Sequence, residues 1–243
     1  MKRRRRLSPL GKVSLFLLLL AGGVLWAWHS FSDSRIAVAL DAGHGGADVG
    51  AQGYVEEKDL TEATVRRLQE LLEADPAYRV ILCPELDRGT TLNSRWRKAN
   101  EGRAELLISV HGNAADTWSA TGFEVYPSPP GREHHEESLR FAGLLARRMA
   151  ETGIGLRGED GIRYAYYVDG EKVFREPSDE PLDEPSFAMV DYPKCPAVLA
   201  EQGFVTNPAD MELLGSQEGC RLAARKYYLA ICDYFGTEPL PEE

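Results

Sequence analysis

Cysteine is scarce in this sequence, and its four cysteines lie far apart. Cys83, Cys195, Cys220 and Cys232 form no C-x-x-C pair, so the spacing typical of a cysteine-bound zinc cluster is missing. An oxidising environment would permit a disulfide between them without requiring one. We therefore expect four buried free thiols.

Positive charge is also in short supply. The 243 residues include 28 Lys and Arg against 38 Asp and Glu, for a formal net charge of −10. Residues 2–6 and 12 hold several of the basic side chains, so the remainder of the chain is more acidic still. Because an acidic surface repels a phosphate backbone, nucleic acid is excluded as an expected partner.

Two further absences narrow the function classes. The sequence shows no internal repeat or low-complexity segment, which excludes a repeat architecture. Its glycine-rich turn, Gly43 to Gly46, runs on into Ala47 and Asp48 instead of Gly-Lys-Ser/Thr, which excludes a P-loop. With 43% hydrophobic residues, the chain is long enough for one well-buried domain and too short for two large ones.

One long uncharged and mostly apolar run is present, from residue 13 to residue 32, between the basic flank and Asp33. A membrane-spanning helix needs about 20 apolar residues, and a cationic flank stays on the cytoplasmic side. We therefore expect residues 1–35 to form a cytoplasmic tip and a membrane anchor, with the rest of the chain outside the cytoplasm. A cleaved signal peptide is the alternative, although no A-x-A site follows the apolar run.

Beyond residue 36, short β-branched runs alternate with amphipathic segments. Strands are predicted at 36–42, 79–83, 106–111, 122–126, 187–190 and 197–201, and helices at 58–74, 92–101, 136–152 and 217–235. Strands separated by helical crossovers favour a twisted, mostly parallel sheet with helices on both faces. The sequence thus predicts one α/β domain over residues 36–236, followed by a frayed tail at 237–243.

Residues 157–185 interrupt this alternation. They are rich in Gly, Pro, Tyr and acidic residues, and Asp169-Gly170 is a strong turn pair between Tyr164–Val168 and Lys172–Phe174. We expect an inserted loop that carries a β-hairpin. It is either a lid over a neighbouring site or a solvated surface loop.

Three chemically useful side chains occupy the ends of expected strands. His44 lies in the turn after the first strand, while His111 and Glu201 end two later apolar strands. A lone strand-end His is more often structural, and Glu57 alone would be an ordinary acid in the first turn of a helix. Ligands gather, however, at the carboxyl edge of an open α/β sheet. Two imidazoles with one carboxylate suit a catalytic zinc, and a further Glu suits a general base, so a metal-assisted hydrolase is predicted.

Several separated motifs then appear in a characteristic order. They are LDAGHGG at residues 40–46, EKDL at 57–60, Leu92-x-x-Arg95-x-x-x-Ala99-Asn100, LISVHGNA at 107–114 and PAVLAE-x-GF-x-x-N at 196–207. Over residues 36–235 the chain resembles the zinc-dependent N-acetylmuramoyl-L-alanine amidases of bacterial cell separation and spore-wall remodelling. It departs from their pattern at Ala42, Gly112 and Gln202, none of which is a ligand position.

The resemblance implies zinc (Zn²⁺) ligands at His44, Glu57 and His111, and a catalytic Glu201. Glu56 is the rival to Glu57, but the family pattern places the ligand directly before Lys. The implied substrate is peptidoglycan, cut at the amide between N-acetylmuramic acid and the L-alanine of the stem peptide. For Arg95, an anchor for a carboxylate near the site and a solvated helix face remain equal alternatives.

Two other functions stay open at this point. A zinc peptidase could act on the stem peptides themselves, and a non-catalytic wall-binding regulator could share the fold. The retention of His44, Glu57, His111 and Glu201 together argues against the regulator, because a protein without activity need not keep all four. Besides peptidoglycan, the expected partners are the membrane, through the N-terminal helix, and an activating protein that the sequence does not name.

Overall fold

The computed structural model describes residues 20, 22, 34–83 and 90–241. The expected membrane anchor and its basic tip lie almost entirely outside these residues. Within the described part of the chain, no helix is long and apolar enough to cross a membrane. The residues from Ile36 onward form one compact unit.

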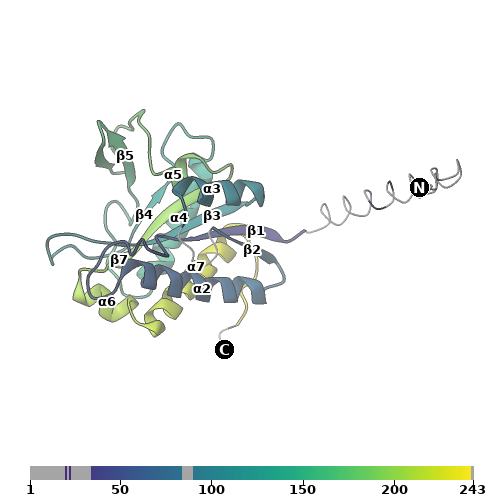
Figure 1. The fold of residues 1–243 in the computed structure, drawn as a ribbon, viewed down its shortest axis with the longest axis horizontal. Helices are drawn as coiled ribbons and strands as arrows, with labels where there is room; N and C mark the ends of the chain where they lie inside the picture. Colours follow the sequence, from purple (N-terminus) through teal and green to yellow (C-terminus); the bar gives the residue numbers. More distant parts are fainter. Residues whose placement is uncertain (1–19, 21, 23–33, 84–89, 242–243) are drawn as a thin grey trace, which may run out of the picture. The chain divides into compact units, whose positions relative to one another are not determined.

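A five-stranded sheet forms the centre of this unit. Its strands are β1 (Ile36–Ala42), β2 (Tyr78–Leu82), β3 (Leu106–Asn113), β4 (Glu124–Pro127) and β7 (Ala197–Phe204). Their order is β2-β1-β3-β7-β4, and only β4 runs antiparallel to its neighbour (Figure 1). The predicted mostly parallel sheet is therefore confirmed, with one antiparallel edge strand.

Helices cover both faces of the sheet, as expected. The helices α2 (Glu57–Ala74), α4 (His135–Ala150) and α7 (Gln217–Phe235) pack on one face, with α7 between the other two. The shorter helices α3 (Leu92–Glu101) and α5 (Ala188–Asp191) cover the other face. The alternation along β1 shows why both faces are apolar: Val38 and Leu40 join the first core, whereas Ala37 and Ala39 join the second.

The predicted strand at 187–190 is wrong, because residues 188–191 form the helix α5 and Phe187 precedes it. A short apolar run can be a buried strand or a buried helical turn, and its periodicity alone does not distinguish the two. Here Val190 and Asp191 both donate backbone hydrogen bonds to the carbonyl of Phe187, which closes a helical turn. Met189 and Val190 are buried. A buried strand would need apolar side chains at the same positions, so their hydrophobicity does not distinguish a helix from a strand.

One further helix, α6 (Pro208–Leu214), was not predicted. Its start carries strong local signals, because the Asn207 side chain accepts hydrogen bonds from the backbone of Ala209 and Asp210, and Pro208 is its first residue. The helix follows β7 directly. The helix is only seven residues long, which is too short for a helical repeat of apolar residues to stand out between β7 and α7.

The insertion does contain a hairpin, as predicted. The strands β5 (Tyr164–Val168) and β6 (Glu171–Arg175) pair antiparallel around Asp169 and Gly170. Both turn residues have positive φ, 51° and 85°, which is the conformation that a two-residue hairpin turn needs. The hairpin forms a two-stranded sheet of its own.

Two smaller expectations have different outcomes. All four cysteines are free and buried, as expected. The tail does not fray over its described part, because the Leu240 backbone donates to the Tyr228 hydroxyl at 2.9 Å and Arg225 donates to the Leu240 carbonyl at 2.7 Å. These bonds hold the tail against α7.

Candidate active site

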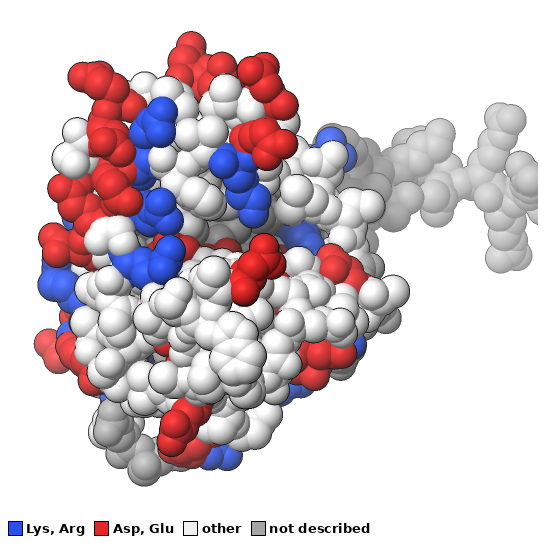
Figure 2. Space-filling view, turned by 90° about the vertical axis from the view of Figure 1, so that its left-hand side faces the viewer, with Lys and Arg blue, Asp and Glu red and all other residues white. Residues whose placement is uncertain are grey.

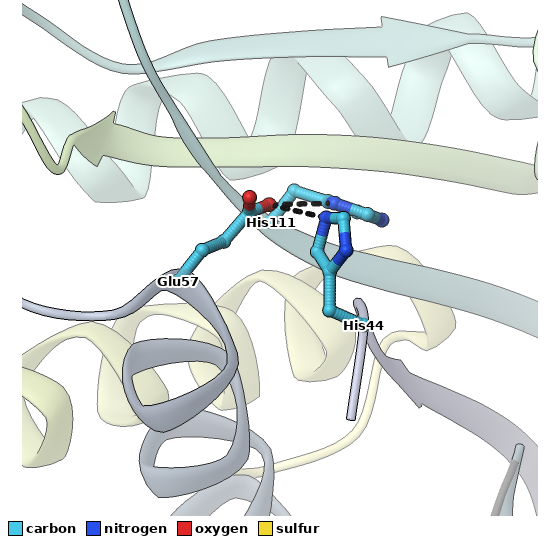
Figure 3. Close-up of side chains that lie close together, drawn as sticks. All are labelled: His44, Glu57 and His111. Atoms are coloured by element: carbon cyan, nitrogen blue, oxygen red, sulfur yellow. Dashed lines mark hydrogen bonds and ion pairs between the residues drawn. The ribbon is translucent and has the colours of Figure 1, made fainter. Parts of the chain in front are cut away.

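The structure brings three of the predicted side chains into one cluster. His44 follows β1, Glu57 is the first residue of α2, and His111 lies near the end of β3 (Figure 3). The same oxygen of Glu57, Oε1, lies 3.1 Å from His44 Nε2 and 2.9 Å from His111 Nδ1. One nitrogen or oxygen from each residue lies within 4.8 Å of the others, which is a spacing that one metal ion could bridge.

The turn after β1 is built to bring the two imidazoles close together. His44 has φ of 66°, an uncommon backbone conformation for a residue other than glycine. A side chain on Gly43 would lie 2.4 Å from the His111 ring, so only glycine leaves room for that ring. Asp48 Oδ2 lies 3.0 Å from His44 Nδ1, which turns His44 Nε2 towards Glu57.

Glu57 is an ionised group in a buried position, with only 4% of its surface exposed. Its Oε2 accepts a hydrogen bond from the Ala51 backbone at 2.8 Å, and its Oε1 accepts one from Gly112 at 3.1 Å. Burial alone would raise the pKa of Glu57, but hydrogen bonds with His111 and His44 outweigh it and hold the pKa well below its usual range. The carboxylate is therefore fixed in place and charged.

The neighbouring Glu56 lies outside the cluster. It accepts a hydrogen bond from Gln52 at 3.3 Å and pairs with Lys58 at 3.3 Å. The rival ligand Glu56 is thus paired with Gln52 and Lys58. The structure places Glu57, and not Glu56, against the histidines.

The two histidines respond to this carboxylate. Its hydrogen bond raises the pKa of His44 to about 9, against the opposing effect of burial. Burial is the largest single effect on the pKa of His111 and lowers it, but the hydrogen bond to Glu57 and the charges of the nearby carboxylates together raise it, so the net shift is upward. The cluster therefore attracts positive charge, either as protons on the imidazoles or as a metal cation that replaces them.

Glu201 lies beside this cluster in a different environment. It is opposite His111 in the β3–β7 pairing, and its Oε2 is buried without a hydrogen-bond partner among the described residues. Burial raises the pKa of Glu201 to about 7, although the nearby His111 opposes the shift. A buried carboxylate oxygen without a partner is uncommon and points to a role in binding or catalysis.

Arg95 resolves the question left open by the sequence, because it is buried and not on a solvated face. It donates to Asp41 Oδ1 at 2.9 Å, to the Ala42 carbonyl at 2.7 Å and also to the His44 carbonyl. Ser109 on β3 donates to the other oxygen of Asp41 at 2.6 Å. This network connects the His44 turn to β1, β3 and α3. Arg95 therefore holds the backbone of the His44 turn in position.

Sequence reasoning missed one further carboxylate at the site. Glu124 on β4 lies directly opposite Glu201 and is 1% exposed. Its partners are Asn113, Arg157 and Arg163. The sequence does place this charged residue inside the otherwise apolar run Phe123 to Tyr126. A carboxylate in such a run needs a buried partner, and this pattern could have identified Glu124.

Comparison with known proteins decides the family. Residues 38–233 match the family described as N-acetylmuramoyl-L-alanine amidase. The chain belongs to this family. The protein is therefore an N-acetylmuramoyl-L-alanine amidase, a hydrolase of peptidoglycan, which favours this activity over the peptidase and regulator alternatives.

Among three similar proteins, two carry the name N-acetylmuramoyl-L-alanine amidase. The amidase is 31% identical over 199 residues to the Bacillus subtilis protein YqiI, covering 82% of this chain and 84% of that one. It is 27% identical over 226 residues to the amidase AmiC of Neisseria meningitidis, covering 85% of this chain but only 54% of AmiC. The catalytic domain of the amidase CwlV from Bacillus (Paenibacillus) polymyxa superposes with a TM-score of 0.69 at 25% identity, over 84% of this chain and 100% of that catalytic domain.

The buried Arg95 network gives a stability prediction. Arg95→Gln leaves Asp41 buried with Ser109 as its remaining side-chain partner, so we expect the free energy of unfolding to fall by about 3–5 kcal/mol. The exposed Arg97 on the same helix is the matched control, and Arg97→Gln should change stability by no more than about 0.5 kcal/mol. Urea denaturation of both variants measures the difference. Equal stability of the two would show that the network does not hold the turn.

Proposed function

We propose that the amidase is zinc-dependent, with His44, Glu57 and His111 as the metal ligands and Glu201 as the general base. The reaction is hydrolysis of the amide between N-acetylmuramic acid and L-alanine, for remodelling or degradation of the cell wall. The observation that carries the proposal is the convergence of three ligand atoms within 4.8 Å, beside a buried carboxylate oxygen that has no hydrogen-bond partner among the described residues.

The residues present fit a zinc ion. Two imidazole nitrogens and one carboxylate oxygen are the donor set of catalytic zinc sites, which leave one position open for water or substrate. Groups outside the cluster already orient two of the ligands: Asp48 contacts the far nitrogen of His44, and the Ala51 backbone holds the second oxygen of Glu57. Such outer contacts typically fix ligand geometry in zinc enzymes.

The reaction then assigns a proton path to Glu201. A bound zinc supplies a Lewis acid that polarises the substrate carbonyl and favours ionisation of water. Glu201 accepts the proton of the attacking water as the new carbon–oxygen bond forms. It returns this proton to the nitrogen of L-alanine as the carbon–nitrogen bond breaks, so the peptide leaves as an amine. A pKa of about 7 suits both steps, because the group can hold and release a proton near neutral pH.

The location of the amidase is a second part of the proposal. We infer that residues 1–35 anchor it in the cytoplasmic membrane with the catalytic domain on the cell-wall side. The support is the uncharged run at residues 13–32 behind a basic flank, together with a substrate that lies outside the membrane. A cleaved leader would instead secrete the domain to the same compartment.

The ligand assignment is tested by a matched pair of neighbours. Glu57→Gln should lose most bound zinc, as should His111→Ala, because a site with three protein ligands can hardly spare one. Glu56→Gln should keep about one zinc per chain, since Glu56 faces Gln52 and Lys58. Metal analysis of the purified proteins gives the answer, and zinc retained in Glu57→Gln but lost in Glu56→Gln would refute the assignment.

The role of Glu201 predicts a pH dependence. The base acts only when deprotonated and its pKa is raised to about 7, so kcat/KM should be full above that pH and fall as the pH drops below it. Glu201→Gln should retain zinc, lose activity by about 10² to 10⁴-fold and lose this limb of the profile. Loss of zinc in this variant would instead make Glu201 a ligand.

The topology follows from the basic flank. A reporter enzyme that works only outside the cytoplasm, fused after residue 243, should be active in cells. The same fusion with the basic residues at 2–6 changed to acidic ones should lose much of this activity, because the orientation signal is removed. A fusion that is active only as a cytoplasmic reporter would contradict the proposal, and release of processed protein into the medium would favour a cleaved leader.

A further inference from the structure

Cationic side chains border the buried Glu201, although the chain as a whole is acidic. Arg157 and Arg163 both contact Glu124, the residue directly opposite Glu201, and the charge of Lys172 also acts on Glu201. Figure 2 shows Lys and Arg side chains beside the hollow in the centre of this face, with Asp and Glu gathered above and to its left. Three cations of the insertion, Arg157, Arg163 and Lys172, thus act on this pair of carboxylates.

Arg157 presents an unused guanidinium fork next to the site. Its Nε is 3.4 Å from Glu124 Oε2, and its guanidinium lies 4.8 Å from the centre of the Phe204 ring. The two terminal nitrogens form no hydrogen bond with any described residue, while about a third of the side chain, 33%, is exposed. Stacking on an aromatic ring leaves the edge of a guanidinium free for a planar anion.

Glu124 already has a hydrogen-bond partner on each of its two oxygens without Arg157. Arg163 Nη1 lies 3.2 Å from Glu124 Oε2, and Asn113 donates to the other oxygen, Oε1. Arg163 in turn is shared with Glu176, whose Oε1 lies 3.1 Å from its Nε. The contact with Glu124 therefore explains the position of Arg163. It does not explain that of Arg157, whose contact with Glu124 is the longer of the two.

The position of Arg157 relative to the reaction indicates which part of the substrate it faces. Directly opposite residues on antiparallel strands project to the same face about 5 Å apart, so Glu124 and its arginines lie beside Glu201. Glu201 returns its proton to the leaving nitrogen of L-alanine, so this side of the site holds the peptide and not the sugar. The lactyl carboxyl of the sugar is itself consumed in the scissile amide, so the free carboxylates of the substrate all belong to the peptide.

We propose that Arg157 binds a carboxylate of the stem peptide, namely the α-carboxylate of the γ-linked D-glutamate that follows L-alanine. Arg163 holds Glu124 so that the guanidinium of Arg157 stays at the rim of the site. This inference rests on the proposed function. A two-pronged guanidinium–carboxylate contact gives geometric selectivity as well as affinity, so the amidase distinguishes stem peptides with a free carboxylate from those in which it is amidated.

Two synthetic substrates test this inference. Each is N-acetylmuramoyl-L-alanine linked to γ-D-glutamyl-L-lysine amide, with the glutamyl α-carboxyl either free or converted to a carboxamide, so that no other carboxylate is present. The full-length zinc-loaded protein should cleave the free acid with a kcat/KM about 10- to 100-fold higher, mainly through a lower KM. Arg157→Gln should bring the ratio close to one by loss on the free acid alone, and Arg157→Lys should restore part of it.

Arg175→Gln is the matched control, because it also removes one positive charge from the insertion, and the Arg175 side chain donates to no described residue other than Phe174, at its carbonyl. Its substrate ratio should stay that of the unmodified protein. A ratio near one in the unmodified protein, or an equal loss on both substrates in Arg157→Gln, would overturn the inference and leave Arg157 a structural partner of Glu124. If Arg157→Gln does not fold, the ratios of the unmodified protein and of Arg157→Lys decide. Failure to cleave either substrate would instead overturn the proposed function.

Discussion

The carboxylate of Glu57 is shared by His44 and His111 at the carboxyl edge of the sheet. Burying an ionised carboxylate costs free energy unless it is paired and hydrogen-bonded. The fold meets this requirement from three directions, with one histidine after β1, the other on β3, and backbone donors from Ala51 and Gly112. A buried carboxylate flanked by two imidazoles is a donor set that can bind a divalent cation.

Three further buried carboxylates near this edge have different roles. Two support the structure and the third is available for the reaction. Asp41 is neutralised by Arg95, and Glu124 by Arg163 with Asn113. Glu201 differs from both, because its buried Oε2 has no partner in the described part of the chain. The paired carboxylates hold the strands and turns in position, while the unpaired one remains available for a proton.

Local patterns in the sequence could predict much of this arrangement. Apolar strands that end in His111 and Glu201, and a glycine-rich turn at His44, place side chains at one edge as soon as a parallel sheet is assumed. The contacts of Arg95 and Glu124 could not be predicted, because they depend on which distant strand lies alongside. The helix α5 was mistaken for a strand for a related reason: the packing of Phe187 to Val190, and not their hydrophobicity, determines their conformation.

The central claim is that this edge of the sheet hydrolyses one particular amide bond, and the products test it most directly. Purified sacculi digested with the zinc-loaded protein should release peptides that begin with L-alanine and leave glycan strands with intact N-acetylmuramic acid, as mass spectrometry would show. Shortened peptides still attached to the glycan would contradict the account, because they would mean that the metal site cuts within the stem peptide.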